Sequence, residues 1–142
     1  YDEGDMENKR TVEQTAHETG LTADTLRYYE RIGLITDIQR AKNGHRRYSD
    51  ADIIWILFLK QLRATGMPIA QMKQFAQLRR DGDGSVTQRR EMLEQHRQNL
   101  TAQVQLIMDF MSVIDLKIAR HQQTEQRLNG EKRHDDNNPP LD

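Results

Sequence analysis

Apolar residues recur at helical spacing along this chain, and glycine, proline and polar turns separate the segments in which they recur. Thr11 and Gln14 form a capping-box pattern at the start of the first segment. Thr22 caps a second short helix, and Gly33 ends it. Because a tight threonine-glycine turn joins the two helices, the pattern predicts a helix-turn-helix over residues 12–32.

The next segment changes from helical spacing to a loose alternation of polar and apolar residues. It covers residues 34–48 and turns at Asn43-Gly44, a dipeptide typical of hairpins, so it predicts a two-stranded wing. Tyr48 is expected to anchor this hairpin on the following helix. Ser49 caps that helix, and a glycine and a proline separate it from another, which gives a second helix pair over about residues 50–80.

A much longer helix is expected after a break rich in aspartate and glycine. Ser85 and Gln88 form another capping-box pattern, and neither glycine nor proline follows before Gly130, so we predict a helix over residues 85–128. Its apolar positions alternate in steps of four and three, which is the spacing of a coiled-coil seam. One small domain cannot bury such a stripe, so the seam predicts a homodimer. The seam residues are Leu100, Val104, Ile107, Met111, Ile114, Ile118 and His121.

The net charge of -1 conceals a segregation of charge along the 142 residues. Residues 8–80 contain 13 Lys and Arg against 7 Asp and Glu, whereas the rest of the chain is acidic. A basic domain is the electrostatic pattern of a phosphate-binding module. We therefore assign residues 9–80 to a DNA-binding domain, with a flexible tail at 1–8 and a disordered polar tail at 129–142.

Several classes of function are excluded by what the composition lacks. With no cysteine, the chain has no disulfide, thiolate metal site or cysteine nucleophile. No apolar run approaches the roughly 20 residues needed to span a bilayer, and the first residues do not resemble a signal peptide, so we expect a cytoplasmic protein. The five histidines lack metal-ligand spacing, and no catalytic pair or glycine-rich phosphate loop stands out. We expect no cofactor, no metal and no enzymatic activity.

The second helix and the wing supply most of the candidate contacts with double-stranded DNA, and Lys60 on the third helix is a weaker candidate for a phosphate contact. On the second helix, Arg27 suits guanine edges or phosphate, Tyr28 suits a phosphate oxygen, and Tyr29 belongs to the core. The wing has a basic cluster that can follow the backbone into the flanking minor groove. The full set of expected DNA contacts is Thr22, Arg27, Tyr28, Arg31, Arg40, Lys42, Asn43, Arg46, Arg47 and Lys60.

The order of these elements and three stretches of sequence resemble the MerR family of bacterial transcription regulators. The stretches are TADTLRYYERIGLI at 22–35, GHRRYSDADI at 44–53 and LRATGMPIAQMK at 62–73. The resemblance implies a mainly α fold, in which a winged helix-turn-helix DNA-binding domain precedes a long antiparallel coiled-coil dimerisation helix. It also implies binding to a pseudo-palindromic promoter element, distortion of the promoter spacer and cooperation with RNA polymerase.

Nothing in the sequence identifies an inducer. The cysteines used by metal-sensing and thiol-stress relatives are absent, and the sequence has a polar tail after residue 128, where drug-sensing relatives have a separate ligand-binding domain. Two other functions stay open at this point: an architectural or excisionase-like DNA-bending protein without an inducer, and a coiled-coil adaptor that binds protein or RNA. The first would use the same DNA contacts, whereas the second predicts no palindromic footprint.

Overall fold

The computed structural model describes residues 9–137 and is almost entirely helical over this range. The expected tail at 1–8 lies outside the described residues, as do residues 138–142 of the expected C-terminal tail. The elements in chain order are α2 (Val12–Thr19), α3 (Ala23–Arg31), β1 (Gln39–Arg40), β2 (Arg46–Arg47), α4 (Asp50–Ala64), α5 (Ile69–Arg80), the 3-10 turn η1 (Asp83–Ser85) and α6 (Val86–Asn137).

The predicted helix starts and stops are confirmed where local capping chemistry sets them. Thr11 and Gln14 form a reciprocal capping box at α2, and Thr22 accepts the amide of Thr25 at α3. Ser49 caps α4 in a second box. Gly33 adopts a φ of 86° directly after α3, a left-handed conformation that favours glycine and redirects the chain toward the wing.

The wing is a short antiparallel hairpin. Gln39 pairs with Arg47 and Arg40 with Arg46, and Gly44 takes a φ of 83° in the predicted turn. A further backbone bridge joins Arg10 to Tyr48, which places the start of the described chain beside the end of the hairpin. The wing is therefore anchored to the chain that leads into α2.

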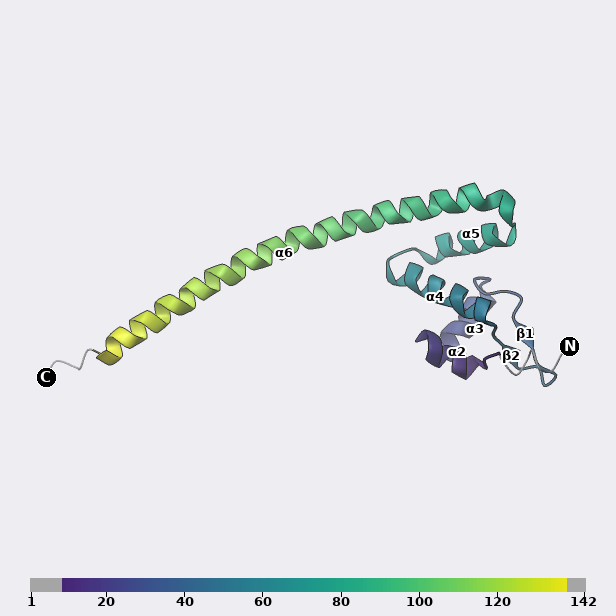
Figure 1. Ribbon diagram of the computed structural model, residues 1–142, viewed down its shortest axis with the longest axis horizontal. Coiled ribbons are helices and arrows are strands. Elements are labelled where there is room, and N and C mark those ends of the chain that lie inside the picture. The colour runs from purple at the N-terminus through teal and green to yellow at the C-terminus, as the bar shows by residue number, and fades with distance from the viewer. Residues whose placement is uncertain (1–8, 138–142) are drawn as a thin grey trace. The chain divides into compact units, whose positions relative to one another are not determined.

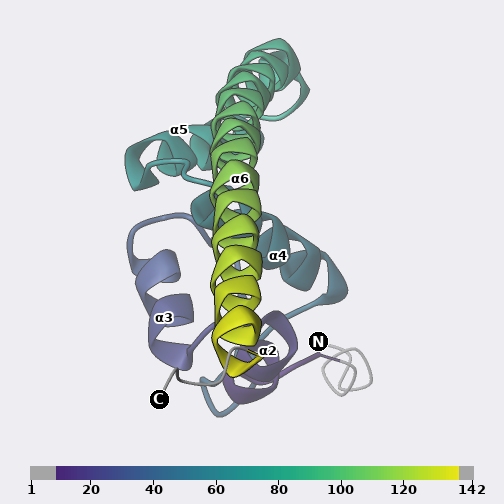
Figure 2. The ribbon, with the colours of Figure 1, turned by 90° about the vertical axis from the view of Figure 1, so that its left-hand side faces the viewer.

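The core lies around α4, which Figures 1 and 2 both place between the α2–α3 pair and α5. From α3, Leu26 is fully buried and Tyr29 nearly so, as predicted for the inner face of that helix. Trp55 on α4 is stacked on Phe75 of α5, with ring centroids 6.1 Å apart. The buried set also includes Leu34, Ile35, Tyr48, Ile53, Ile56, Leu59, Leu62, Met67 and Met72.

The first compact unit ends at His96, so it includes the first eleven residues of α6. Met92 packs against the core, and the buried His96 lies 2.9 Å from the Thr65 hydroxyl. Ser85 does not make the predicted capping box. Its hydroxyl donates to the carbonyl of Leu78 and accepts from Arg89, because the tight turn after α5 leaves helix-end carbonyls within its reach.

The long helix also continues past its predicted end at residue 128, to Asn137. Residues 129–137, expected to be disordered, are therefore helical in the structure. This segment is polar but contains good helix formers, and Arg127 pairs with Glu131 one turn later at 3.2 Å. A lone glycine at 130 costs only about 1 kcal/mol within a helix, so it does not end α6.

Candidate nucleic-acid interface

Helix α3 presents the polar face that the sequence predicts. Arg27 and Tyr28 are exposed on the outer side of the helix, with 44% and 40% of their surface accessible, while Leu26 and Tyr29 are buried on the inner side. The guanidinium of Arg31 lies 5.4 Å from the centroid of the Tyr28 ring, which is a cation–π distance. A basic and aromatic face of this kind is free to contact a ligand.

Arg27 and Thr22, near the start of α3, both have partners on the same helix. Arg27 pairs with Asp24 at 3.3 Å, but the Asp24 side chain is 97% exposed, and such surface pairs contribute little. The Thr22 hydroxyl accepts the Thr25 amide and donates to the Thr25 hydroxyl. Arg27 can therefore exchange its partner for a DNA group at small cost, whereas Thr22 primarily caps the helix.

A groove of about 240 Å³ joins α3 to the wing and to the first turn of α2. Arg27 reaches this groove from α3, and Arg46 and Arg47 reach it from β2. The first turn of α2 adds backbone amides that lack helical partners and favour an anion. The other lining residues are Thr11, Val12, Glu13, Gly44 and His45. Arg27 thus lines the same concave site as Arg46 and Arg47, which follow it by 19 and 20 residues in the sequence.

Not all of the wing arginines are free to contact DNA. Arg40 and Arg46 both form ion pairs with Glu30 on α3, and Arg40 Nη2 lies 3.4 Å from Glu30 Oε1. Arg40 also donates to the carbonyl of Gly44 at 3.0 Å. Arg47 makes only a hydrogen bond to the carbonyl of Arg46 among the described residues. The predicted cluster therefore divides into two arginines held by a carboxylate and one that is not.

Arg10 and Tyr48 hold the base of the wing. Their backbones exchange two hydrogen bonds, at 2.9 and 2.8 Å. The Arg10 guanidinium bonds to Glu18 and Asp50, and these two carboxylates raise its pKa above the ordinary value. Tyr48 is fully buried, and burial raises the pKa of its phenol. Both residues support the interface from inside the fold, as predicted for Tyr48 and not foreseen for Arg10.

Lys60 was expected to contact DNA, but its ammonium donates to the carbonyl of Thr19 at 2.8 Å. This carbonyl is at the C-terminal end of α2, where the helix dipole favours a cation. The same ammonium lies 2.6 Å from the position that a Cβ on Gly20 would occupy. Lys60 therefore ties α4 to the helix-turn-helix, and its proposed contact with phosphate stays a prediction.

Replacing Lys60 with methionine should lower the free energy of unfolding by about 1 kcal/mol, because it removes a partly buried, charge-assisted hydrogen bond. Denaturant titration can follow this change through Trp55, the single tryptophan, which is buried in the core. Lys73→Met removes an exposed lysine from α5 and should change stability by less than about 0.5 kcal/mol. Unchanged stability with weakened DNA binding in Lys60→Met would show that the lysine contacts DNA instead.

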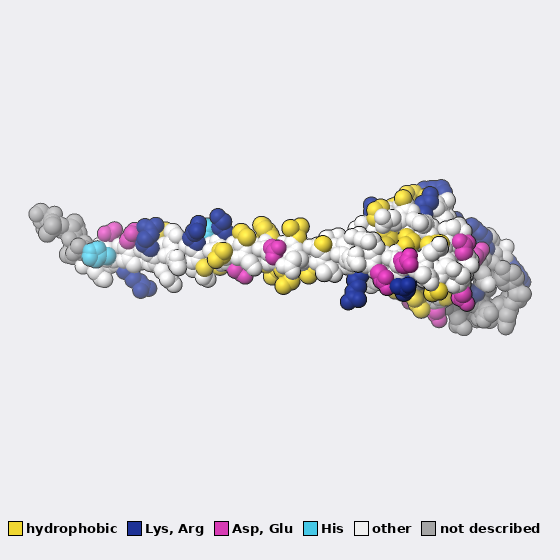
Figure 3. Space-filling view, turned by 90° about the horizontal axis from the view of Figure 1, so that it is seen from above, with side chains coloured by type: hydrophobic (Ala, Val, Ile, Leu, Met, Phe, Trp, Pro, Cys, Tyr) yellow, Lys and Arg dark blue, Asp and Glu magenta, His cyan; other side chains and the backbone are white. Residues whose placement is uncertain are grey.

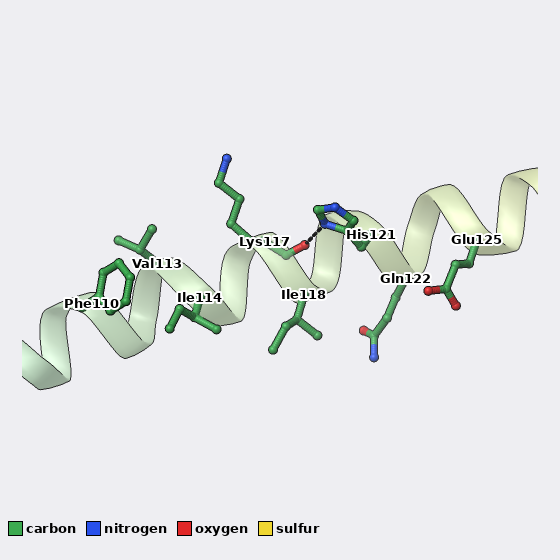
Figure 4. Close-up of a pocket in the computed structure, with 8 residues that line it drawn as sticks. All are labelled: Phe110, Val113, Ile114, Lys117, Ile118, His121, Gln122 and Glu125. Atoms are coloured by element: carbon green, nitrogen blue, oxygen red, sulfur yellow. Dashed lines mark hydrogen bonds between the residues drawn. The ribbon is translucent and has the colours of Figure 1, made fainter.

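Helix α6 carries the predicted seam on its surface. Figure 3 shows hydrophobic side chains gathered along the middle of this helix. Ile107 and Met111 are 60% and 56% exposed, and Ile114 and Ile118 project from the helix together in Figure 4. At the end of the seam, His121 Nδ1 lies 2.7 Å from the carbonyl of Lys117. Within one chain, the predicted dimerisation residues from Val104 to Ile118 are thus exposed apolar side chains, whereas Leu100 is partly buried.

Residues 9–137 contain neither a metal site nor a membrane-spanning helix. No group of three or more His, Asp or Glu side chains in this range is arranged to hold a metal ion. In the same range, no helix combines the length and apolar character needed to cross a membrane.

The main feature beside the candidate site that sequence reasoning missed is the pair of ion pairs made by Glu30. Glu30 lies between Tyr29 and Arg31 on the predicted recognition helix, so its charge was visible. Its partners are 10 and 16 residues away, and no local pattern indicated that the wing folds back onto it. The available signal was that several arginines of the wing could pair with the carboxylate of Glu30.

Two models of known protein families together match most of the described chain. A model of the MerR HTH family of regulatory proteins matches residues 10–78, and a MerR DNA-binding model matches residues 55–115. The first match contains the helix-turn-helix, the wing and most of α5, and the second extends into α6.

Individual relatives agree with these family matches. An uncharacterized HTH-type transcriptional regulator of Haemophilus influenzae is 30% identical over 112 residues, which cover 79% of this chain and 83% of the relative. The HTH-type transcriptional regulator AdhR of Bacillus subtilis is 43% identical over 89 residues, covering 63% of this chain and 64% of AdhR. Among solved structures, HiNmlR, a MerR family regulator lacking the sensor domain and bound to promoter DNA, matches with a TM-score of 0.76 at 29% identity, covering 83% of this chain and 94% of HiNmlR.

Proposed function

Because the chain belongs to the MerR family of DNA-binding transcription regulators, we propose that it binds a pseudo-palindromic promoter element as a homodimer and activates transcription by distorting the promoter spacer. The observation that carries this proposal is the groove in which Arg27 meets Arg46 and Arg47. It joins a recognition helix and a wing in one basic surface. The proposed cellular location is the cytoplasm, where a bacterial chromosome is accessible.

In the proposed complex, α3 enters the major groove and the wing follows the adjacent backbone. Arg27 is placed to read a guanine edge or to bind a phosphate, and Tyr28 and Arg31 flank it on the same face. On the wing, the exposed tip with Lys42 and Asn43 extends toward the flanking minor groove. Phosphate contacts of this kind fix the register of the protein, while Arg27 supplies sequence preference.

The exposed stripe on α6 supports the homodimer. Exposed apolar patches of this extent are uncommon on monomers and mark interfaces, and a seam in steps of four and three fits a second helix of the same kind. The antiparallel direction follows the family resemblance. Two winged helices held by such a coil would lie about one DNA turn apart, roughly 34–36 Å, and would read two half-sites.

Distortion of the promoter spacer is the proposed route to activation. Regulators that grip two half-sites can bend and untwist the DNA between them, at a deformation cost offset by the contacts made. The structure of HiNmlR on promoter DNA supports a promoter as the target of this chain. RNA polymerase is then the proposed second partner, since it must engage both promoter boxes of the distorted spacer.

Selection of bound genomic fragments, followed by footprinting, tests this function. We expect two symmetric half-sites between the promoter boxes of an overlong spacer, and bending of the DNA in the complex. A footprint on a single half-site would contradict the homodimer. Equal affinity for all duplexes, with bending at any sequence, would instead identify an architectural DNA-bending protein.

Lys42→Ala should weaken binding to all duplex DNA alike, because a lysine at the wing tip binds phosphate rather than a base. The slope of log affinity against log salt should fall by about one unit. Titrations of cognate and scrambled duplexes at several salt concentrations measure both effects. A loss confined to the cognate duplex would assign Lys42 to base recognition.

A further inference from the structure

One acidic residue lies where the recognition helix meets the wing. Glu30 is the penultimate residue of α3, and its side chain is only 24% exposed. One carboxylate oxygen accepts from Arg40 on β1 at 3.4 Å, and the other accepts from Nε of Arg46 on β2. A single side chain on the helix therefore holds both strands of the hairpin.

The buried Leu34, Ile35 and Tyr48 anchor the base of the wing in the core, whereas few contacts within residues 9–137 restrain its strands and tip. The two strands have two residues each, and Arg10–Tyr48 is the one isolated bridge beyond them in the described residues. Arg40 extends the restraint to the tip, because it also donates to the carbonyl of Gly44. Loss of the Glu30 ion pairs would thus deprive both strands of the hairpin of these side-chain links to α3.

The ion pair between Arg46 and Glu30 is shielded from solvent more than an ordinary surface pair. The Arg46 side chain is only 26% exposed, so solvent screens this pair less than it screens Arg27–Asp24. Glu30 is also close enough to the buried Tyr48 to raise the pKa of its phenol, although burial is the larger cause. The carboxylate is therefore part of the support beneath the groove.

We propose that Glu30 is a positioning residue, which fixes the wing against the recognition helix so that Arg27 and Arg47 engage one DNA site together. Arg40 and Arg46 then act through this ion pair rather than as independent phosphate contacts. The proposal rests on the DNA-binding function proposed above. In this view, the affinity of the interface depends on the position of the wing as well as on the charge of the surface.

Whether Glu30→Gln strengthens or weakens DNA binding distinguishes a positioning role from a simple effect of charge. Removing a carboxylate from a phosphate-binding surface should strengthen binding to every duplex if only charge matters. If Glu30 positions the wing, affinity for the selected cognate site should instead fall on the order of tenfold, as expected for breaking contacts that are coupled to one another. Affinity for scrambled DNA should stay the same or rise.

Glu13→Gln is the matched control, because Glu13 lines the same groove but makes no ion pair to the wing in the described part of the chain. It removes the same charge and should leave cognate binding unchanged or tighter. If Glu30→Gln tightens cognate binding as Glu13→Gln does, the positioning role is wrong. Unfolding followed through Trp55 reports whether each variant is folded.

Arg46→Met breaks the same ion pair from the wing and completes a double-mutant cycle. We expect it to weaken cognate binding about as much as Glu30→Gln, and the double variant to be no weaker than the weaker single variant. Additive losses, or a loss in Arg46→Met beside a gain in Glu30→Gln, would show that Arg46 contacts DNA directly and would overturn the proposal. If the wild-type protein prefers no duplex sequence, the proposed function itself fails. The same cycle can then be measured on any duplex. Equal and non-additive losses in affinity would still support the positioning role, and opposite effects of the two substitutions would reject it.

Discussion

Arg27→Ala is expected to weaken binding to the cognate site by about 1 to 3 kcal/mol and to relax the base preference at one position of each half-site. Arg27 is the exposed arginine on the outer face of α3 that also reaches the groove shared with the wing. Its present partner, Asp24, is exposed and weakly bound, so little internal stability is lost with the side chain. Mobility-shift titration against single-base variants of the site measures the effect.

The control for this substitution is Arg127→Ala, which removes one positive charge from the exposed C-terminal part of α6. It should leave cognate affinity nearly unchanged, because Arg127 lies outside residues 9–80, which supply all of the proposed contacts with DNA. Unchanged specific binding in Arg27→Ala would show that α3 is not the recognition helix. Equal weakening on all duplexes would reduce Arg27 to a phosphate contact.

The parts of this fold that the sequence predicted are those set by neighbouring residues. The capping box at Thr11, the caps at Thr22 and Ser49 and the turn at Gly44 each depend on residues within about four positions. The inner face of α3 was equally predictable, since helical spacing alone brings Leu26 and Tyr29 to one side. Local chemistry was sufficient to place the candidate recognition helix.

The supports of the site were not predictable, because their partners are distant in the chain. Lys60 bonds to a carbonyl 41 residues earlier, and Arg10 pairs with a carboxylate 40 residues later. An arginine or lysine in the sequence of a basic domain suggests a phosphate contact by default. Only the fold showed that Lys60, Arg40 and Arg46 have internal partners.

Pairing of two α6 seams in an antiparallel coil defines which residues face one another. The spacing permits six apolar layers, in which Leu100 faces Ile118, Val104 faces Ile114 and Ile107 faces Met111, each pair occurring twice. In this register His121 lies just outside the apolar layers. The two layers nearest the two-fold axis are those of Ile107 and Met111, so a change there acts twice at the centre of the dimer.

Ile107→Asp should therefore convert the protein to a monomer at micromolar concentration. Each dimer would have to bury two carboxylates without partners, at several kcal/mol each, which weakens association on the order of 1,000-fold or more. Sedimentation velocity measures the change in mass. Binding to the full palindrome should fall by roughly 100- to 10,000-fold, because each half-site is then bound without the benefit of a linked second domain. Binding to an isolated half-site should be unaffected.

Leu116→Asp provides the matched control, since Leu116 is 72% exposed on the same helix and falls on roughly the opposite face from Leu100. It introduces the same charge and a somewhat larger loss of helix propensity, but it should leave the dimer and its DNA affinity intact. If Leu116→Asp is monomeric and Ile107→Asp remains a dimer, the interface lies on the other face of α6. If both variants remain dimeric, the coil is not the dimer interface, and the pairing of two winged helices on one promoter element would need another contact.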